Sequence, residues 1–155
     1  MKANIQLSKL EQTVFYTIEK TIKSYRQFAQ KNIKHDELDI TIDQWLVLKT
    51  LADEPGISQK EMAKAVFKDN ASIARMIELL VKKKYLIRSF HREDRRRYQL
   101  KMTALGKTTY EQLIPIVHAN RTTALAGISN EEVALLSSLL QRITDNCQHQ
   151  PIDEA

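Results

Sequence analysis

Three segments of the sequence repeat one helix-start signal, and together they limit what the chain can fold into. The tetrapeptides TIDQ, SQKE and SNEE begin at Thr41, Ser58 and Ser129, and each places Ser or Thr three residues before Gln or Glu. In such a capping box the hydroxyl of the first residue accepts the fourth residue's backbone N–H, and the fourth side chain accepts the N–H of the first. Each segment therefore predicts the start of a helix. Only three glycines and three prolines are present, so long irregular loops are unexpected and helix should dominate.

Apolar spacing predicts further helices on both sides of these starts. A stripe with steps of three to five residues consists of Leu7, Leu10, Val14, Ile18, Ile22, Tyr25, Phe28 and Ile33. It predicts one long amphipathic helix before Thr41. Thr103 is expected to cap a helix over residues 104–126, with a kink at Pro115 and an end near Gly127.

The middle of the chain has the pattern of a helix-turn-helix. A short helix is predicted from Ser58 to about Phe67, and the polar letters KDN then break it. Asp69 or Asn70 can cap a second helix over residues 71–83, which ends in lysines. Two short helices joined by a break of this length are typical of a helix-turn-helix.

The stretch HREDRRRYQL, residues 91–100, follows directly and is flanked by the β-leaning runs YLIRSF and RRYQLKM. It places four arginines and two acids within seven residues, and the two runs predict a hairpin around them. A helix-turn-helix followed by a basic hairpin is a winged helix. The predicted fold is therefore mainly α with a small β-hairpin: a winged helix-turn-helix DNA-binding lobe plus a helical dimerisation lobe.

The positive charge of the chain is concentrated in one place. Residues 82–97 contain eight Lys and Arg against two acids, a net +6, whereas the whole chain carries +5. The remaining residues therefore sum to −1. A compact basic patch on a neutral body is typical of a polyanion-binding protein, although a solvated basic face that serves solubility would look the same in isolation.

The two faces of the segment 71–83 suggest how DNA would be read. Ile73, Met76, Ile77 and Leu80 should face the core, and small residues surround Arg75 on the other side. This lets the helix enter a major groove while Arg75 reaches a base edge, most often guanine. The candidate DNA-binding residues are Asn70, Ala71, Ser72, Ala74, Arg75, Arg92, Asp94, Arg95, Arg96 and Arg97. Asp94, two residues before Arg96, can hold that guanidinium extended toward the minor groove.

Other classes of protein find little support. The four histidines lie in separate segments without metal-ligand spacing, and no phosphate loop or nucleophile motif is present, so neither an enzyme nor a cofactor or metal site is expected. The single Cys147 excludes an intrachain disulfide framework and fits a reducing cytosol, and the thiol has no evident activating pocket. No apolar run reaches the length of a membrane span and MKANIQLSKL lacks a signal-peptide centre, so a cytoplasmic protein without membrane contact is expected.

Residues 40–107 resemble the MarR-type regulators, a family of dimeric winged-helix repressors and activators. The resemblance is carried by ITIDQWLVLKTL, ISQKEMAKAV, DNASIARMIELLVKKKYLIRS and HREDRRRYQLKMTALGK. It implies that Asp94 and Arg96 form the wing pair and that Ser72 and Arg75 contact DNA from the recognition helix. Lys84 stands where the family usually has glycine; lysine costs roughly 1 kcal/mol in a left-handed conformation, so this helix end is expected to differ locally.

The same resemblance implies a homodimer and a small, often aromatic effector. Residues 1–36 and 107–147 would form the helical dimerisation region, residues 40–106 the winged helix-turn-helix domain, and residues 148–155 a disordered tail. The length of the apolar stripe supports the dimer independently, since one small winged helix cannot cover it. The bulky candidates for an effector pocket are Phe15, Tyr16, Trp45 and Tyr110. Aromatic residues at helical spacing are more often simply part of the core.

We therefore predict a transcriptional regulator, a repressor relieved by a small effector, that binds double-stranded DNA as a homodimer at a pseudo-palindromic operator. Its half-sites should lie about one helical turn apart. Two alternatives stay open. A non-specific architectural nucleic-acid-binding protein would show weak sequence discrimination and an affinity driven by salt alone. A winged-helix protein-interaction module would not need its basic wing.

Overall fold

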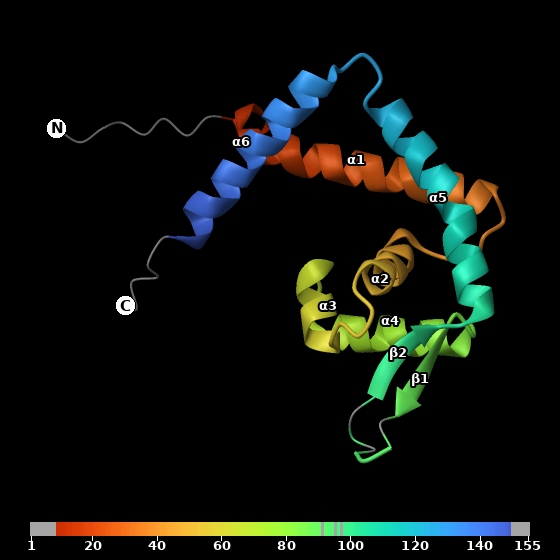
Figure 1. Ribbon diagram of the computed structural model, residues 1–155. Coiled ribbons are helices and arrows are strands. Elements are labelled where there is room, and N and C mark those ends of the chain that lie inside the picture. The colour runs from red at the N-terminus through yellow and green to blue at the C-terminus, as the bar shows by residue number, and fades with distance from the viewer. Residues whose placement is uncertain (1–8, 91, 95, 97, 150–155) are drawn as a thin grey trace. The chain divides into compact units, whose positions relative to one another are not determined.

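The computed structural model describes residues 9–90, 92–94, 96 and 98–149. Along the chain the elements are the 3-10 helix η1 (Leu10–Gln12), α1 (Val14–His35), α2 (Ile42–Asp53), α3 (Gln59–Ala65), α4 (Asn70–Lys82), β1 (Leu86–Phe90), β2 (Tyr98–Met102), α5 (Ala104–Ala124) and α6 (Asn130–Gln148). A mainly helical chain with one antiparallel hairpin is the predicted fold class, which is confirmed (Figure 1).

All three predicted capping boxes form with both of their hydrogen bonds. Thr41, Ser58 and Ser129 are the N-caps of α2, α3 and α6. At Ser129 the backbone N–H donates to Glu132 over 2.8 Å, and the N–H of Glu132 donates to the serine hydroxyl over 3.1 Å. These contacts span three residues, so the local sequence suffices to specify them.

The first long helix starts later than the apolar stripe predicted. Thr13 is its N-cap and accepts the N–H of Tyr16, so α1 begins at Val14, and Leu10 lies in the separate η1. Leu7 is outside the described residues. Apolar periodicity continues across a helix boundary, whereas the cap that sets the boundary is a single hydroxyl.

The helix-turn-helix consists of α3 and α4. Asp69, one of the two predicted caps, accepts the N–H of Ser72 over 2.7 Å and begins α4. The preceding α3 ends at Ala65, two residues earlier than predicted. Phe67 then adopts a left-handed φ of 57° and is 94% exposed.

The end of α4 keeps the geometry that a glycine would give it. Lys84 has a φ of 63°, its N–H donates to the carbonyl of Val81, and the N–H of Tyr85 donates to the carbonyl of Leu80, both over 2.9 Å. This is the Schellman pattern. The expectation of a locally different helix end is therefore wrong: the lysine adopts the strained conformation.

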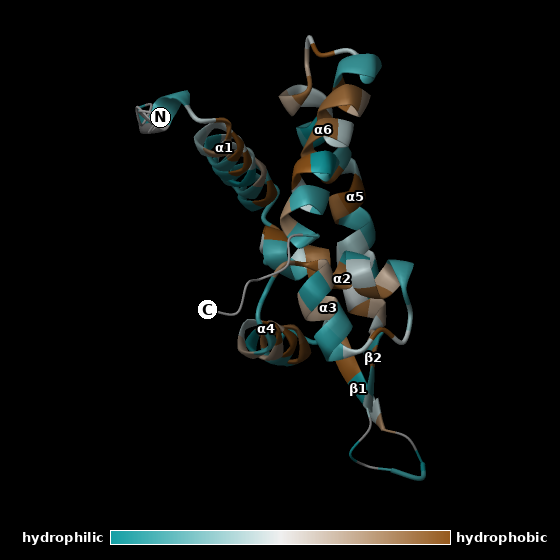
Figure 2. Ribbon diagram, turned by 90° about the vertical axis from the view of Figure 1, so that its left-hand side faces the viewer, coloured by the Kyte–Doolittle hydropathy of each residue, from teal (hydrophilic) through white to brown (hydrophobic). Residues whose placement is uncertain are grey.

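One hydrophobic core joins α1, α2, α3, α4, the hairpin and α5. Its largest fully buried side chains are Ile33, Val47, Leu48, Met62, Ile73, Ile77, Leu80, Leu86 and Leu113. Figure 2 shows hydrophobic and hydrophilic residues on opposite sides of α4, so this helix is anchored by one side and leaves the other free.

The chain divides into two compact units between Asn120 and Arg121. The first contains the core just described, and in it Asn32 of α1 donates to buried Asn120 of α5 over 2.7 Å. The second contains α6, whose 19 residues include none that is buried.

Among the described residues, no helix combines the length and apolar character that crossing a membrane requires.

Candidate nucleic-acid interface

The start of α4 presents most of the predicted recognition residues to solvent. Asn70, Ala71 and Arg75 are exposed, and Ser72 and Ala74 are half-buried. Of the described residues, none forms a hydrogen bond or ion pair with the Arg75 guanidinium, so it is available to a ligand.

The predicted inward side of α4 is largely as expected. Ile73, Ile77 and Leu80 are completely buried, whereas Met76 is only half-buried. The helix is therefore held from behind by three aliphatic side chains while Arg75 projects from the opposite side.

Ser72 and Asp69 together order the first turn of this helix. Besides the backbone bond, the Ser72 hydroxyl donates to the second Asp69 carboxylate oxygen over 2.9 Å. Hydrogen bonds from the backbone and then the side chain of Ser72 lower the pKa of Asp69 from its ordinary value of 3.8. Because the Ser72 hydroxyl already serves the cap, its predicted phosphate contact would have to share this donor.

The wing tip is exposed at the positions that the structure describes. Arg92, Asp94 and Arg96 all face solvent, whereas the candidates Arg95 and Arg97 lie outside the described residues. Asp94 accepts the backbone N–H of Arg96 over 2.9 Å. No ion pair joins the Asp94 carboxylate to the Arg96 guanidinium, both of which are described. Asp94 thus orders the turn that carries Arg96, rather than holding its guanidinium as predicted.

Two cations of the predicted basic patch are engaged inside the protein. Arg88 of β1 binds the Glu78 carboxylate of α4, and that hydrogen bond raises the pKa of the guanidinium. Lys83 donates to the Asp39 side chain and to its backbone carbonyl, each over 3.0 Å. The charge available to a polyanion is therefore smaller than the count of residues 82–97 suggests.

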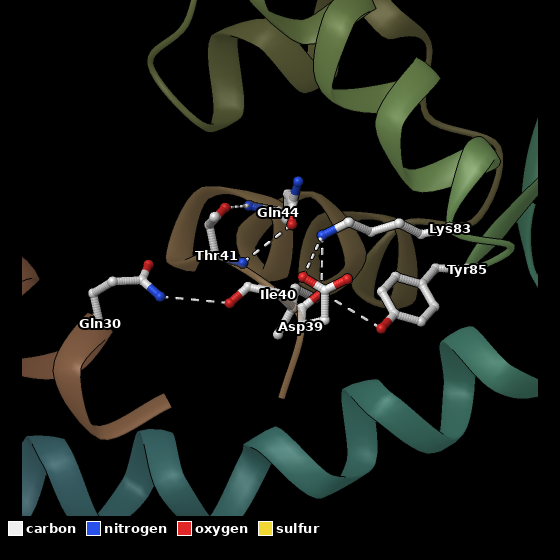
Figure 3. A network of polar contacts seen from close by, with 7 residues as sticks. All are labelled: Gln30, Asp39, Ile40, Thr41, Gln44, Lys83 and Tyr85. Atoms are coloured by element: carbon white, nitrogen blue, oxygen red, sulfur yellow. Dashed lines mark hydrogen bonds and ion pairs between the residues drawn. The ribbon is translucent and has the colours of Figure 1, made fainter. Parts of the chain in front are cut away.

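Figure 3 shows that Lys83 belongs to a network connecting α4 with α1. Tyr85 donates to the Asp39 carbonyl over 3.5 Å beside Lys83. Asp39 lies in the segment that connects α1 with α2. In the same segment, the carbonyl of Ile40 accepts a hydrogen bond over 3.5 Å from the side-chain amide of Gln30 in α1. The end of α4 is thus tied to the segment between α1 and α2. These contacts span up to 46 residues, so sequence reasoning did not find them.

A second joint connects the end of α4 with the start of α5. The Thr103 hydroxyl donates to the Lys84 carbonyl over 2.6 Å and accepts the N–H of Gly106 over 3.0 Å. A β-carbon on Gly106 would lie 2.0 Å from the Tyr85 carbonyl oxygen, so only glycine fits there. The letters MTALG carried this signal in the sequence.

The four aromatic residues proposed for an effector pocket divide into two places. Trp45 of α2 and Tyr110 of α5 stack with ring centroids 6.3 Å apart, and Trp45 is 5% exposed. Phe15 and Tyr16 lie in the first turn of α1, and Phe15 is 62% exposed. No ring contact among the described residues joins the two pairs.

The stacked pair includes a buried polar atom. The indole N–H of Trp45 makes no hydrogen bond with any residue that the structure describes. Buried polar groups are normally hydrogen-bonded, so this nitrogen is a donor that a bound molecule could use.

A groove of about 500 Å³ lies between the second half of α1 and the start of α2. Its lining residues are Arg26, Gln27, Gln30, Lys31, Lys34, Thr41, Ile42 and Asp43. Arg26 pairs with Asp43 across it, and Gln30 accepts the N–H of Ile42 over 3.0 Å. The side chains of Arg26, Gln30, Thr41 and Asp43 in this groove thus already have polar partners within the protein.

The described residues form no cluster of metal ligands, and the single thiol of the chain lies on α6. Among the described residues, no three His, Cys, Asp or Glu side chains lie close enough together to hold a metal ion. Cys147 is exposed near the end of α6.

Comparison with known proteins places this geometry in context. Residues 40–98 match the model of the MarR family. One similar structure is that of BpsR from Bordetella bronchiseptica, solved in work on how 6-hydroxynicotinic acid regulates its DNA binding. Its sequence is 23% identical and its TM-score is 0.79, and the match covers 90% of this chain and 98% of BpsR. A mutant MarR from E. coli complexed with operator DNA is 24% identical and has a TM-score of 0.78. The match covers 88% of this chain and 99% of that protein. PcaV of Streptomyces coelicolor, solved in complex with its natural ligand, is 22% identical and has a TM-score of 0.77. The match covers 90% of this chain and 96% of PcaV. At these identities the solved structures establish the fold.

Proposed function

We propose that this chain, whose residues 40–98 match the MarR family model, is a sequence-specific regulator of transcription that binds double-stranded DNA as a homodimer. The observation that carries the proposal is the exposed, unengaged Arg75 on a helix whose other side is locked into the core. A rigid helix with a free arginine near its start suits base reading in the major groove.

The wing adds a second DNA-binding element. Arg96, on the turn ordered by Asp94, is proposed to enter the minor groove, where A·T-rich sequence deepens the negative potential. Arg92 is proposed to meet a phosphate, which contributes affinity without sequence information. Of the remaining candidates, Ala71 and Ala74 keep the helix start narrow, and Asn70 and Ser72 add polar groups there.

Apolar surface on the outer helices supports the homodimer. Phe15 on α1 is 62% exposed, and on α6 Leu135 and Leu136 are 60% and 52% exposed. Side chains of this size normally find a partner when they line one face of a helix. Two copies related by a twofold axis would place two recognition helices on a pseudo-palindromic operator.

We further propose that the chain is a repressor and that a small aromatic effector relieves it. The unpaired Trp45 indole N–H beside Tyr110 supports a pocket for such a molecule. To act, the effector must bind the DNA-free conformation more tightly than the DNA-bound one. BpsR, described in work on how 6-hydroxynicotinic acid regulates its DNA binding, and PcaV, solved in complex with its natural ligand, share the fold.

Selection of duplexes from a random library, followed by affinity measurements across salt concentrations, tests the function. Arg75→Ala and Arg96→Ala should each weaken the selected duplex by about 1–3 kcal/mol and relax sequence preference at the positions they read. Arg92→Ala should weaken all duplexes alike and lower the salt slope by about one unit.

Two outcomes would favour the other classes of protein. Enrichment of no sequence, with affinity that depends on salt alone, would indicate an architectural nucleic-acid-binding protein. A chain that binds no duplex at all, with a wing that tolerates alanine replacement, would indicate a protein-interaction module.

A further inference from the structure

Tyr98 connects the outer end of the wing with both helices of the helix-turn-helix. It forms the last strand pair before the tip, opposite Phe90. Its hydroxyl donates to the side-chain oxygen of Gln59, the first residue of α3, over 2.9 Å. The Arg88 guanidinium lies 5.3 Å from the centroid of the Tyr98 ring and also binds Glu78 in α4. We call Gln59, Glu78, Arg88 and Tyr98 the wing clamp.

The hydrophobic core holds only the inner end of this hairpin. Leu86 and Leu100 are buried, whereas Phe90 and Tyr98 at the outer end are 58% and 36% exposed. A two-stranded ribbon is marginally stable alone, and its twist varies widely. Without further contacts this outer pair could point in many directions.

We propose that the wing clamp sets the direction of the wing tip relative to α4, so that Arg75 and Arg96 can engage one stretch of DNA together. This inference rests on the proposed function. Binding at two places at once is favourable only when the second group is already held near its site. Because Arg88 already binds Glu78, its role is to position the wing rather than to bind a phosphate.

Tyr98→Phe is the sharpest variant, because it removes the bond to Gln59 and keeps the ring beneath Arg88. The affinity for a duplex selected by the wild-type chain should fall about threefold to tenfold, as for loss of one hydrogen bond. Gln59→Met should have the same effect, and the double variant should be no weaker than either single one. Gln99→Ala, on the opposite side of the same strand, is the matched control and should bind like wild type.

A double-mutant cycle separates positioning from general stability. Once Arg96→Ala has removed the tip contact, Tyr98→Phe should weaken binding no further, whereas its effect should persist in an Arg75→Ala background. Equal losses in both backgrounds would mean that the hydroxyl only stabilises the domain, and the proposal would be overturned.

Amide hydrogen exchange tests the clamp without DNA, and so separates its failure from failure of the proposed function. Tyr98→Phe should speed exchange in the outer strand pairs, from Ser89 and Gln99 outward, and leave α4 unchanged. Unchanged exchange there overturns the clamp, whether or not the wild-type chain selects a duplex. Faster exchange in a chain that selects no duplex would support the clamp and contradict the DNA-binding function.

Discussion

At the scale of single residues, this chain ends several helices with side chains that are strained there. Glu37, Phe67 and Lys84 follow the ends of α1, α3 and α4 with φ values of 59°, 57° and 63°. A left-handed conformation costs a non-glycine residue roughly 1 kcal/mol. The hydrogen bonds that these turns close at α3 and α4 offset that cost.

Lys84→Gly should therefore stabilise the folded protein. The two hydrogen bonds of the helix end would be kept while the steric strain is relieved, a gain of about 1 kcal/mol. In thermal unfolding at a fixed protein concentration, the midpoint should rise by about 2–4 °C. A lower midpoint would mean that the lysine side chain contributes something that its backbone geometry does not reveal.

Gly106→Ala should have the opposite effect. The new β-carbon would meet the backbone carbonyl of Tyr85, which cannot move without breaking the joint with Thr103. We expect a loss of about 3 kcal/mol in urea unfolding, at the upper end of overpacking effects. Gly127→Ala is the control: its φ of 79° is strained for alanine but nothing lies within 4 Å, so about 1 kcal/mol is expected. Equal losses at the two sites would exclude the close contact as the cause.

At the scale of elements, α4 begins with a carboxylate cap, Asp69. Because the folded-state pKa of Asp69 is lowered, its contribution to stability is fully present above the ordinary value of 3.8 and is lost as the pH falls through the folded value. Asn caps helices about as well as Asp but carries no charge. The stability advantage of wild type over Asp69→Asn should therefore shrink steadily in acid.

Urea unfolding of both proteins between neutral pH and about pH 3 measures this difference. The comparison cancels the titration of the other carboxylates, including that of Glu61, whose pKa is also lowered by its bonds to Ser58. A difference that stays constant across this range would show that the carboxylate charge does not matter to the cap.

Elements could be predicted from this sequence wherever short-range contacts decide them. The boxes at Thr41, Ser58 and Ser129 close over three residues, and the hairpin and helix-turn-helix follow from local patterns. The wing clamp could not be predicted in this way, because Tyr98 meets Gln59 across 39 positions. The same holds for Asp39 and Lys83, 44 positions apart, whose pairing depends on how the core packs.

In the candidate site, too, the features that depend on local sequence could be predicted, and the contacts between distant residues could not. The exposure of Arg75 follows from its place opposite Ile73, Ile77 and Leu80, which helical periodicity specifies. The sequence pattern linked Asp94 with the Arg96 guanidinium, but which atom of Arg96 the carboxylate binds depends on the shape of the turn. Charge counting failed for Arg88, because its partner Glu78 lies on another element.

At the scale of the whole molecule, the apolar surface of α6 leads to the last prediction. Leu135, Leu136 and Leu139 share one face and are 60%, 52% and 42% exposed. Fully burying a leucine contributes about 1.5–3 kcal/mol, so a carboxylate in the middle of this face should prevent the proposed dimer from forming. Leu136→Asp should therefore convert a dimer into a species with the mass of one chain, 18.0 kDa.

Light scattering at one protein concentration measures the mass, with Ala134→Asp as the matched control. By helical spacing Ala134 lies on the opposite side of α6, and it is exposed, so the same new side chain there should leave the dimer intact. Removing residues 1–34 should give insoluble or unfolded protein, because that deletion uncovers the rest of the interface and takes Ile33 from the core. A stable, soluble monomer from that deletion, or a wild-type mass of one chain, would contradict the dimer.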